Sequence, residues 1–343
     1  MSRHIDVITT TISGSVRDWG KVKQIIPLFD RYGEGDVELF EATSHRAARE
    51  KARELVRSGR RTLISAGGSG TFNSVVEGCF DARCDLSDLT LGFLRKGSAD
   101  LIGKVLGMPD DIERAVEVFV RAIRNNHTVP CDVILARSGS GPTPPRHFVG
   151  YGGAEIFGEI PYYTENRFIK YYKGILGQLF GDLGPFFVGT NLAILCGLPR
   201  RLGRKKRQWE IRVDGDAVSR GAYQAMIIVN GDLGPNLPFA RSEPLGSGYF
   251  FLFTIGDRGF FNLYRQLKHA FDGSITDDPA RWGFESFHID RSLEIRPDTG
   301  GMFPVNTDGS VMECTSSARF EIVDRISLFA NPESDTLKQQ RTP

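Results

Sequence analysis

The chain has 343 residues, of which 40% are hydrophobic and 25% are charged, and its formal net charge is +1. This length can bury the cores of two domains, and the near-neutral charge shows no overall basic excess of the kind that nucleic-acid binding requires. The five cysteines are scattered without a C-x-x-C pair, which argues against a zinc site or a disulfide framework and indicates a reducing compartment. We therefore expect a cytoplasmic protein with no nucleic-acid partner.

No stretch of the sequence reads as a targeting segment or a membrane span. The N-terminus lacks a signal-peptide h-region. The most apolar stretch, residues 174–199, is interrupted by Asp182 and contains six glycines, so it predicts a buried helix and a strand. We expect at most a peripheral association with a membrane.

The first 125 residues alternate strand patterns with helix patterns. Strands are predicted by β-branched and apolar runs at 5–10, 37–40, 61–66 and 90–94. Helices are predicted by amphipathic spacing at 17–30, 43–58 and 111–124, the second of them capped by Thr43 or Ser44. This alternation predicts a parallel, Rossmann-like sheet that binds ligands at the carboxyl ends of its strands.

The most informative stretch is residues 63–78, which read L-I-S-A-G-G-S-G-T-F-N-S-V-V-E-G. An apolar strand leads into a glycine turn, and a helix pattern opens at Thr71. At such a turn, unsatisfied backbone N–H groups and the helix dipole attract an anion, and glycines let a phosphate come close. A plain strand-to-helix turn with several glycines would have the same spacing, so this pattern alone leaves both interpretations open.

A second glycine-containing loop follows the strand at 90–94. Residues 95–109 read R-K-G-S-A-D-L-I-G-K-V-L-G-M-P, about 30 residues after the first loop. Both loops follow parallel strands and therefore fall on the same edge of the predicted sheet, where ligands bind.

From about residue 129 the pattern changes to short β-type runs separated by turns such as Asp214-Gly215, which predicts a mainly antiparallel second domain. An aromatic-rich helical insertion at 152–181 would line an acyl-chain cleft or simply pack in the core. Residues 200–207 read R-R-L-G-R-K-K-R, with six cations. This run is either a solvated loop or a contact for anionic lipid headgroups.

The two loops and a third segment resemble motifs of the diacylglycerol kinase catalytic-domain superfamily, which includes bacterial lipid kinases, sphingosine kinases and ceramide kinases. The matching residues of the first motif are Gly67, Gly68, Gly70, Thr71, Asn73, Val75, Val76 and Gly78. Those of the second motif are Gly97, Leu106, Gly107 and Pro109, with Ser98 in place of threonine. In the third, Pro304–Ser310, the matches are Asp308 and Gly309.

The chain also departs from these motifs at acidic positions. Ser69 and Leu101 stand where the family has aspartate, Ser310 stands where it has glutamate, and Asp100 replaces an asparagine. Two functions therefore stay open. The first is an atypical lipid kinase acting on a diacylglycerol- or ceramide/sphingoid-like hydroxyl, and the second is a catalytically impaired paralogue that binds nucleotide or lipid.

The resemblance implies an α/β nucleotide domain over residues 1–128, completed by strands at about 319–332, and a β-sandwich lipid-binding domain over 129–318, followed by a tail at 333–343. The active site would lie in the cleft between the domains. The implied cofactors are ATP and Mg²⁺. The implied partners are a lipid substrate at a membrane surface, contacted through residues 200–207, and a second copy of the chain in a homodimer.

The resemblance also implies roles for individual residues. Asp308 would act as general base or position the acceptor hydroxyl, although an Asp-Gly hairpin turn explains it equally well. Asp100 would take over part of the role of the acid missing at Ser69. The nucleotide would be bound by Thr10, Ser13, Thr43, Gly67, Gly68, Ser69, Gly70, Thr71, Asn73, Gly97 and Ser98. For Thr43, a helix N-cap is the alternative.

Overall fold

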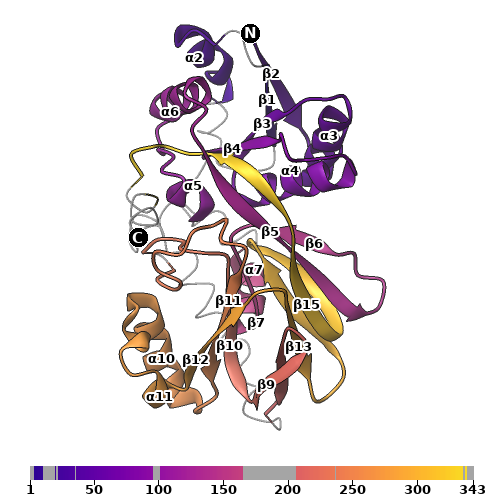
Figure 1. Ribbon diagram of the computed structural model, residues 1–343, viewed down its shortest axis with the longest axis vertical. Coiled ribbons are helices and arrows are strands. Elements are labelled where there is room, and N and C mark those ends of the chain that lie inside the picture. The colour runs from indigo at the N-terminus through magenta and orange to yellow at the C-terminus, as the bar shows by residue number, and fades with distance from the viewer. Residues whose placement is uncertain are drawn as a thin grey trace. The chain divides into compact units, whose positions relative to one another are not determined.

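The computed structural model describes residues 4–10, 20, 22–34, 36–95, 101–164, 206–235, 237–334 and 337 (Figure 1). The chain forms two compact units. Unit 1 comprises Met1–Asp132, Ser242–Gly246 and Asp324–Pro343, and unit 2 comprises Val133–Arg241 and Ser247–Val323.

Unit 1 is built on a parallel sheet. Its strands are β1 (Ile5–Thr10), β2 (Val37–Ala42), β3 (Thr62–Gly67) and β4 (Thr90–Arg95), in the spatial order β2-β1-β3-β4. The end of β15 (Ser310–Phe329) adds a further parallel strand beside β4. Every residue of β1 and β3 is buried, as expected for central strands covered on both faces. The strand order reverses between β1 and β3, and that point is where doubly wound sheets bind ligands.

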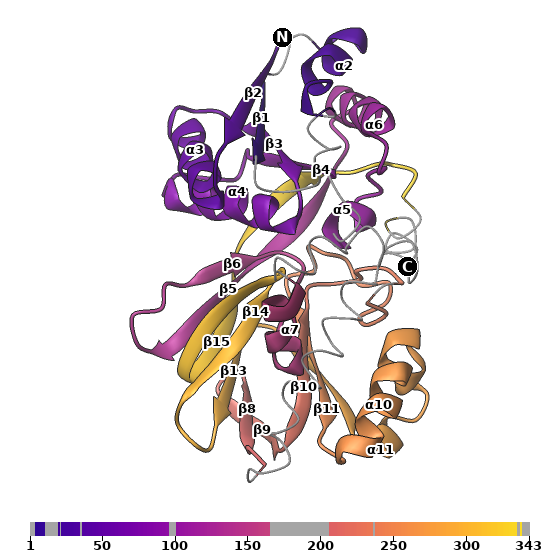
Figure 2. The same ribbon diagram turned by 180° about the vertical axis from the view of Figure 1, so that it is seen from behind.

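Helices cover both faces of this sheet. On one face α3 (His45–Arg57) packs against α4 (Ser69–Asp81), and on the other α2 (Ile25–Arg31) packs against α6 (Ile112–Arg124) (Figures 1 and 2). The short helix α5 (Leu101–Val105) follows the second loop. The parallel α/β organisation predicted for the N-terminal part is confirmed.

Unit 2 consists mainly of antiparallel strands around an aromatic core. The strands are β5 (Thr128–Ser140), β6 (Arg146–Phe148), β7 (Tyr151–Glu155), β8 (Trp209–Val213), β9 (Asp216–Gly221), β10 (Tyr223–Val229), β11 (Phe250–Gly256), β12 (Phe284–Ile289), β13 (Ser292–Pro297), β14 (Met302–Thr307) and β15. Neighbours follow the order β12-β11-β10-β7-β14-β15, and β13 links β15 to β8. Fully buried side chains such as Trp209, Phe148 and Phe320 fill the core. The antiparallel organisation predicted here is also confirmed.

Two parts of unit 2 differ from the sequence analysis. Residues 152–155 belong to strand β7 instead of the predicted helical insertion, of which α7 (Ile156–Thr164) is the described helical part. Three further elements were not predicted: α10 (Phe260–Asp272), the 3-10 turn η2 (Ser274–Thr276) and α11 (Pro279–Trp282). Within the residues that the model describes, no helix has both the length and the apolar character to cross a membrane.

Candidate functional site

The glycine turn lies at the switch point of the unit 1 sheet. β3 ends at Gly67, Gly68 is the N-cap of α4 with an extended backbone (φ −95°, ψ −176°), and no side chain caps this helix. The backbone N–H groups of Thr71 and Phe72 donate to the carbonyl of Gly68 at 3.0 and 3.1 Å. The N–H groups of Ser69 and Gly70 come earlier in the helix, where no helix carbonyl can accept from them. These two N–H groups are therefore left to an external acceptor. The turn therefore presents backbone N–H groups, and anion binding by them stays a prediction.

The three glycines of the turn differ in what a side chain at each position would meet. A Cβ at Gly67 would lie 2.5 Å from Thr71 Oγ1, and a Cβ at Gly70 would lie 2.9 Å from the His45 ring, so packing requires glycine at both. Among the described residues, a Cβ at Gly68 would meet nothing within 4 Å, and the φ of Gly68 is one that any residue adopts. Gly68 therefore borders open space in front of the helix terminus, where a phosphate would fit.

Two threonines support the turn from below. Thr10, at the end of β1, and Thr71, in the first turn of α4, are both buried, and their hydroxyl oxygens are 2.8 Å apart. This hydrogen bond ties the end of one strand to the helix that follows its neighbour. The two hydroxyls thus hold the turn in place, whereas Gly68, Ser69 and Gly70 form its half-buried surface.

The start of α3 reaches the same turn. Ser44, and not Thr43, is its N-cap, because the Ser44 hydroxyl accepts a hydrogen bond from Ala47 N at 3.1 Å. The N-cap alternative for Thr43 is therefore wrong, and Thr43 is an exposed residue between β2 and α3. His45, the first residue of α3, contacts Gly70 and was missed, since nothing in its local sequence indicates that contact.

The next polar residues of α4 face inward. Asn73 is buried, and so is Glu77, whose Oε2 lies 3.2 Å from Arg49 Nη2. Arg49 also donates to both carboxylate oxygens of Asp81, at 2.5 and 2.9 Å, in the bidentate arrangement typical of strong pairs. Gly78 allows this close approach of α3 and α4, because a Cβ there would lie 2.2 Å from the Arg49 carbonyl oxygen. Glu77 therefore joins the two helices.

Four of the predicted site residues, Ser13, Gly97, Ser98 and Asp100, lie outside the described residues. The structure thus brings together Thr10 and the turn at 67–71, with Asn73 one helical turn further along α4. Leu101, at a motif position where the family has an acid, is the first residue of α5.

Asp308 lies in unit 2, in the two-residue turn between β14 and β15. Thr307 pairs with Ser310, and both turn residues have positive φ (48° at Asp308 and 86° at Gly309), the signature of a type I′ hairpin. The Asp308 carboxylate is buried and accepts hydrogen bonds from the backbone N–H groups of Val149, Tyr151 and Gly150 at 2.8, 2.9 and 3.1 Å. Asp308 is thus both the hairpin residue and the acceptor for a neighbouring backbone segment.

Burial dominates the electrostatics of this carboxyl group. It raises the pKa of Asp308 to about 6, although the three backbone N–H groups stabilise the carboxylate and lower the pKa. Two asparagines bind the backbone around Asp308, one at the hairpin turn and one at the segment that Asp308 accepts from. Asn306 Oδ1 accepts a hydrogen bond from Gly309 N at 2.8 Å, and Asn230 Nδ2 donates to the Val149 carbonyl at 2.8 Å. Neither asparagine was predicted as a site residue. In the sequence, Asn230 directly precedes a glycine, and Asn306 lies three residues before Gly309.

Only the end of the basic run at 200–207 falls within the described residues. Lys206 Nζ lies 3.1 Å from Asp257 Oδ1, and Arg207 Nη1 lies 4.0 Å from Glu155 Oε1. These two cations are therefore paired with acids of unit 2, and residues 200–205 lie outside the described part.

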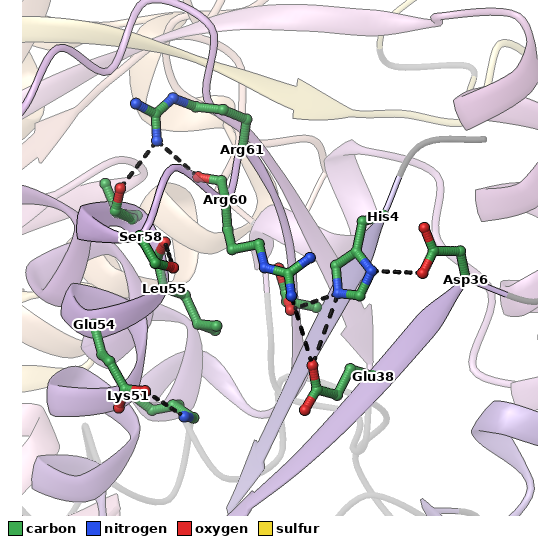
Figure 3. Close-up of polar contacts among 11 residues, drawn as sticks. His4, Asp36, Glu38, Lys51, Glu54, Leu55, Ser58, Arg60 and Arg61 are labelled. Carbon is green, nitrogen blue, oxygen red and sulfur yellow. Dashed lines mark hydrogen bonds and ion pairs between the residues drawn. The ribbon is translucent and has the colours of Figure 1, made fainter. Parts of the chain in front are cut away.

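A second polar cluster lies at the opposite, amino edge of the parallel sheet (Figure 3). His4 lies 2.6 Å from Asp36 and 3.1 Å from the buried Asp6, and Glu38 completes the only group of potential metal ligands among the described residues. Burial raises the pKa of Asp6, and the charges of His4 and Arg60 oppose that shift. Since the Arg60 guanidinium already lies 3.9 Å from both Asp6 and Glu38, a resident cation balances these acids.

Comparison with known proteins agrees with the observed fold. Chains similar in structure include a diacylglycerol kinase from Bacillus anthracis (TM-score 0.61, 17% identity, covering 96% of this chain and 97% of that one). An NAD kinase from Archaeoglobus fulgidus in complex with ATP has a TM-score of 0.53 at 14% identity and covers 98% of each chain. These similarities define the class: the chain has the two-domain fold that diacylglycerol kinases and NAD kinases share.

The sequence comparisons narrow the class to a family. Residues 4–135 match the family model of the diacylglycerol kinase catalytic domain. A diacylglycerol kinase from Staphylococcus carnosus is 27% identical over 260 residues, which cover 71% of this chain and 72% of the relative. One from Staphylococcus saprophyticus is 24% identical over 270 residues, covering 76% and 77%. The resemblance to the diacylglycerol kinase catalytic domain that the motifs predicted is thus confirmed, and the relatives support a kinase.

Proposed function

We propose that this protein is an ATP-dependent lipid kinase that transfers the γ-phosphate of ATP to a hydroxyl of a diacylglycerol-like lipid. The match of residues 4–135 to the family model supports the lipid-kinase class, and the names of the relatives favour diacylglycerol over a ceramide or sphingoid acceptor. The observation that carries the proposal is the glycine turn at 67–70. It combines an uncapped helix N-terminus with open space in front of Gly68.

The chain would contribute to phosphate binding mainly through its backbone. The N–H groups of Ser69 and Gly70 and the dipole of α4 would bind the nucleotide phosphates, and the half-buried Ser69 hydroxyl would add a further donor. The Thr10–Thr71 hydrogen bond would keep these donors in position. Positioning and charge stabilisation of this kind make up most of the catalysis of phosphoryl transfer.

The residues at the turn fit ATP better than they fit a protein-bound metal ion. Mg²⁺, when bound, would neutralise charge on the transferred phosphoryl group. Among the described residues, no cluster of metal ligands lies at the turn, and Glu77 pairs with Arg49. The ATP phosphates would therefore supply most of the ligands of the metal ion, and Asp100 is the proposed ligand from the protein.

Asp308 would serve the acceptor hydroxyl. A carboxyl group whose pKa is raised to about 6 is a better proton acceptor near neutral pH than an ordinary aspartate. Its three backbone hydrogen bonds fix the orientation of the carboxylate and so favour accurate placement of the acceptor. We further propose that residues 200–207 contact anionic lipids and that the protein forms a homodimer.

Transfer of label from [γ-³²P]ATP with Mg²⁺ tests the proposal. The acceptors are diacylglycerol, ceramide, sphingosine and monoacylglycerol in mixed micelles, and the variant Asp308→Asn is assayed in parallel. We expect labelled phosphatidic acid from the wild type and little from the variant. ATP binding without transfer to any lipid would refute kinase activity and favour the impaired paralogue, in which serines at positions 69 and 310 have replaced the catalytic acids.

A further inference from the structure

A cavity of about 550 Å³ lies in unit 2, on the strands β5, β13 and β15. Figures 1 and 2 label these strands, with β5 in magenta, β13 in orange and β15 in yellow. Glu294 pairs with Arg319 across β13 and β15. Because side chains alternate along a strand, Arg296 and Ser317 share their face, while Ile295 and Ala318 point into the core. The cavity therefore lies on the polar face of a well-packed sheet.

Three arginines line this cavity, one from each strand: Arg137, Arg296 and Arg319. Each side chain is about half exposed. Glu321 is shared by two of them, at 3.5 Å from Arg137 and 3.6 Å from Arg319. These distances exceed the 2.7–2.9 Å that is typical of strong charge-assisted hydrogen bonds, so both guanidinium groups keep most of their donors for another acceptor.

The third arginine has a closer partner. Arg296 Nη2 donates to Glu294 Oε1 at 3.0 Å. Partial burial raises the pKa of Glu294, but hydrogen bonds from Arg296 and Ser317 and the charges of Arg296 and Arg212 lower it overall, so Glu294 is ionised at neutral pH. Three guanidinium groups then face two carboxylates, Glu294 and Glu321, and the cavity carries a net charge of +1.

Small residues and one strained residue give the cavity its depth. Ser316 has a φ of 65°, which interrupts the regular course of β15 at the cavity wall. A Cβ at Gly139 would lie 2.2 Å from Ser317 Oγ, so β5 and β15 approach closely beneath the opening. A Cβ at Gly300, which also lines the cavity, would meet nothing within 4 Å among the described residues. A larger side chain at Gly300 would therefore take up open space at the cavity.

We propose that this cavity, lined by Arg137, Arg296 and Arg319, is a binding site for a phosphate monoester group. Guanidinium groups converging from three strands match the oxygens of a compact dianion, and the serine hydroxyls on the wall add donors. A concave cavity of this volume suits one headgroup or small molecule better than a flat charged surface does. The phosphate would come from a soluble metabolite or from a phosphorylated lipid.

The cavity is separate from the site proposed for the acceptor lipid. Ser316 follows Asp308 by eight residues along β15, which corresponds to about 25 Å of extended strand. The cavity also lies in the unit that does not contain the glycine turn. Phosphate binding to the cavity can therefore be measured without reference to kinase activity.

Equilibrium binding by the full chain tests the proposal with three probes: ³²P-orthophosphate, glycerol 3-phosphate, and phosphatidylcholine vesicles with or without phosphatidic acid. The test variants are Arg137→Gln/Arg319→Gln, which removes charge, and Gly300→Leu, which fills space and leaves the charge unchanged. Arg265→Gln, an exposed arginine of α10, is the matched control. ATP binding and thermal unfolding are measured for every variant to show that the fold is retained.

We expect both test variants to bind the phosphate probes at least about tenfold more weakly than the wild type, whereas Arg265→Gln binds them normally. Binding of glycerol 3-phosphate would identify a soluble source, and binding only of vesicles with phosphatidic acid would identify a lipid source. The proposal is overturned if no probe binds or if both test variants bind like the wild type. Equal weakening by Arg265→Gln would also overturn it, since surface charge alone would then explain the binding.

Discussion

Replacing Gly68 with valine separates ligand binding at the glycine turn from the stability of the fold. The backbone there is extended, and a Cβ would meet nothing within 4 Å in the described part of the chain, so a valine fits this part without strain. The free energy of unfolding should therefore change by less than about 0.5 kcal/mol. The added methyl groups, however, would occupy the space in which a phosphate would approach the N–H groups of Ser69 and Gly70.

The expected loss of ATP affinity follows from those two donors. A hydrogen bond to a charged group contributes about 1.5–3 kcal/mol, so losing both costs about 3–6 kcal/mol, or roughly a 10²–10⁴-fold weaker binding. Isothermal titration with ATP measures this loss, and thermal unfolding measures stability. Gly68→Ala should weaken binding less than Gly68→Val. Gly20→Val, whose Cβ also meets nothing within 4 Å where neighbouring residues are described, should bind ATP normally. Normal ATP binding by a folded Gly68→Val protein would refute phosphate binding at this turn.

Three further substitutions test the surroundings of the two candidate sites. Thr71→Val should cost about 1–3 kcal/mol of stability, because the buried Thr10 hydroxyl loses its hydrogen bond to Thr71. Thr10→Val/Thr71→Val should restore part of that loss, as measured by chemical denaturation. Equal losses in the single and double variants would contradict the coupling of the two hydroxyls. Gly78→Ala should lower the melting temperature although alanine favours helices, because its Cβ would lie 2.2 Å from a backbone oxygen; an increase would show that α3 can move. Asp308→Asn should reduce kcat, and the free energy of unfolding of the wild type relative to this variant should fall by about 2.4 kcal/mol between pH 4 and 7. The sign follows because the raised pKa of Asp308 favours folding only below about pH 6, and a pH-independent difference would refute it.

The sequence predicted the parallel sheet and the glycine turn because both depend on local patterns. Apolar strand runs, glycines and helical spacing lie within about ten residues of one another around Gly67 and Gly68. The pairing of Thr10 with Thr71 is different, since 61 residues separate them and only the sheet order brings them together. The choice between Thr43 and Ser44 as N-cap likewise depended on backbone geometry that the residue types do not determine.

The wrong prediction of a helix at residues 152–155 has a physical cause. Gly152 and Gly153 are poor strand formers, yet β7 needs them because its neighbours approach closely. A Cβ at Gly153 would lie 2.0 Å from the Met226 carbonyl oxygen on β10, and one at Gly152 would lie 2.9 Å from the Asn306 carbonyl oxygen on β14. Tertiary packing here overrides local propensity, and the sequence alone shows only the propensity.

The same close packing explains why the Asp308 site was only half visible in the sequence. An Asp-Gly pair predicts a hairpin turn, and the positive φ values of Asp308 and Gly309 bear that out. A turn needs no buried carboxylate, however. Burial of the Asp308 carboxylate raises its pKa even though three N–H donors oppose that shift, and a raised pKa costs stability at neutral pH. Asparagine would form the same type of turn without that cost. The cost is best explained if the carboxylate orders the segment at 149–151 for the acceptor, which is the role that Asp308→Asn tests.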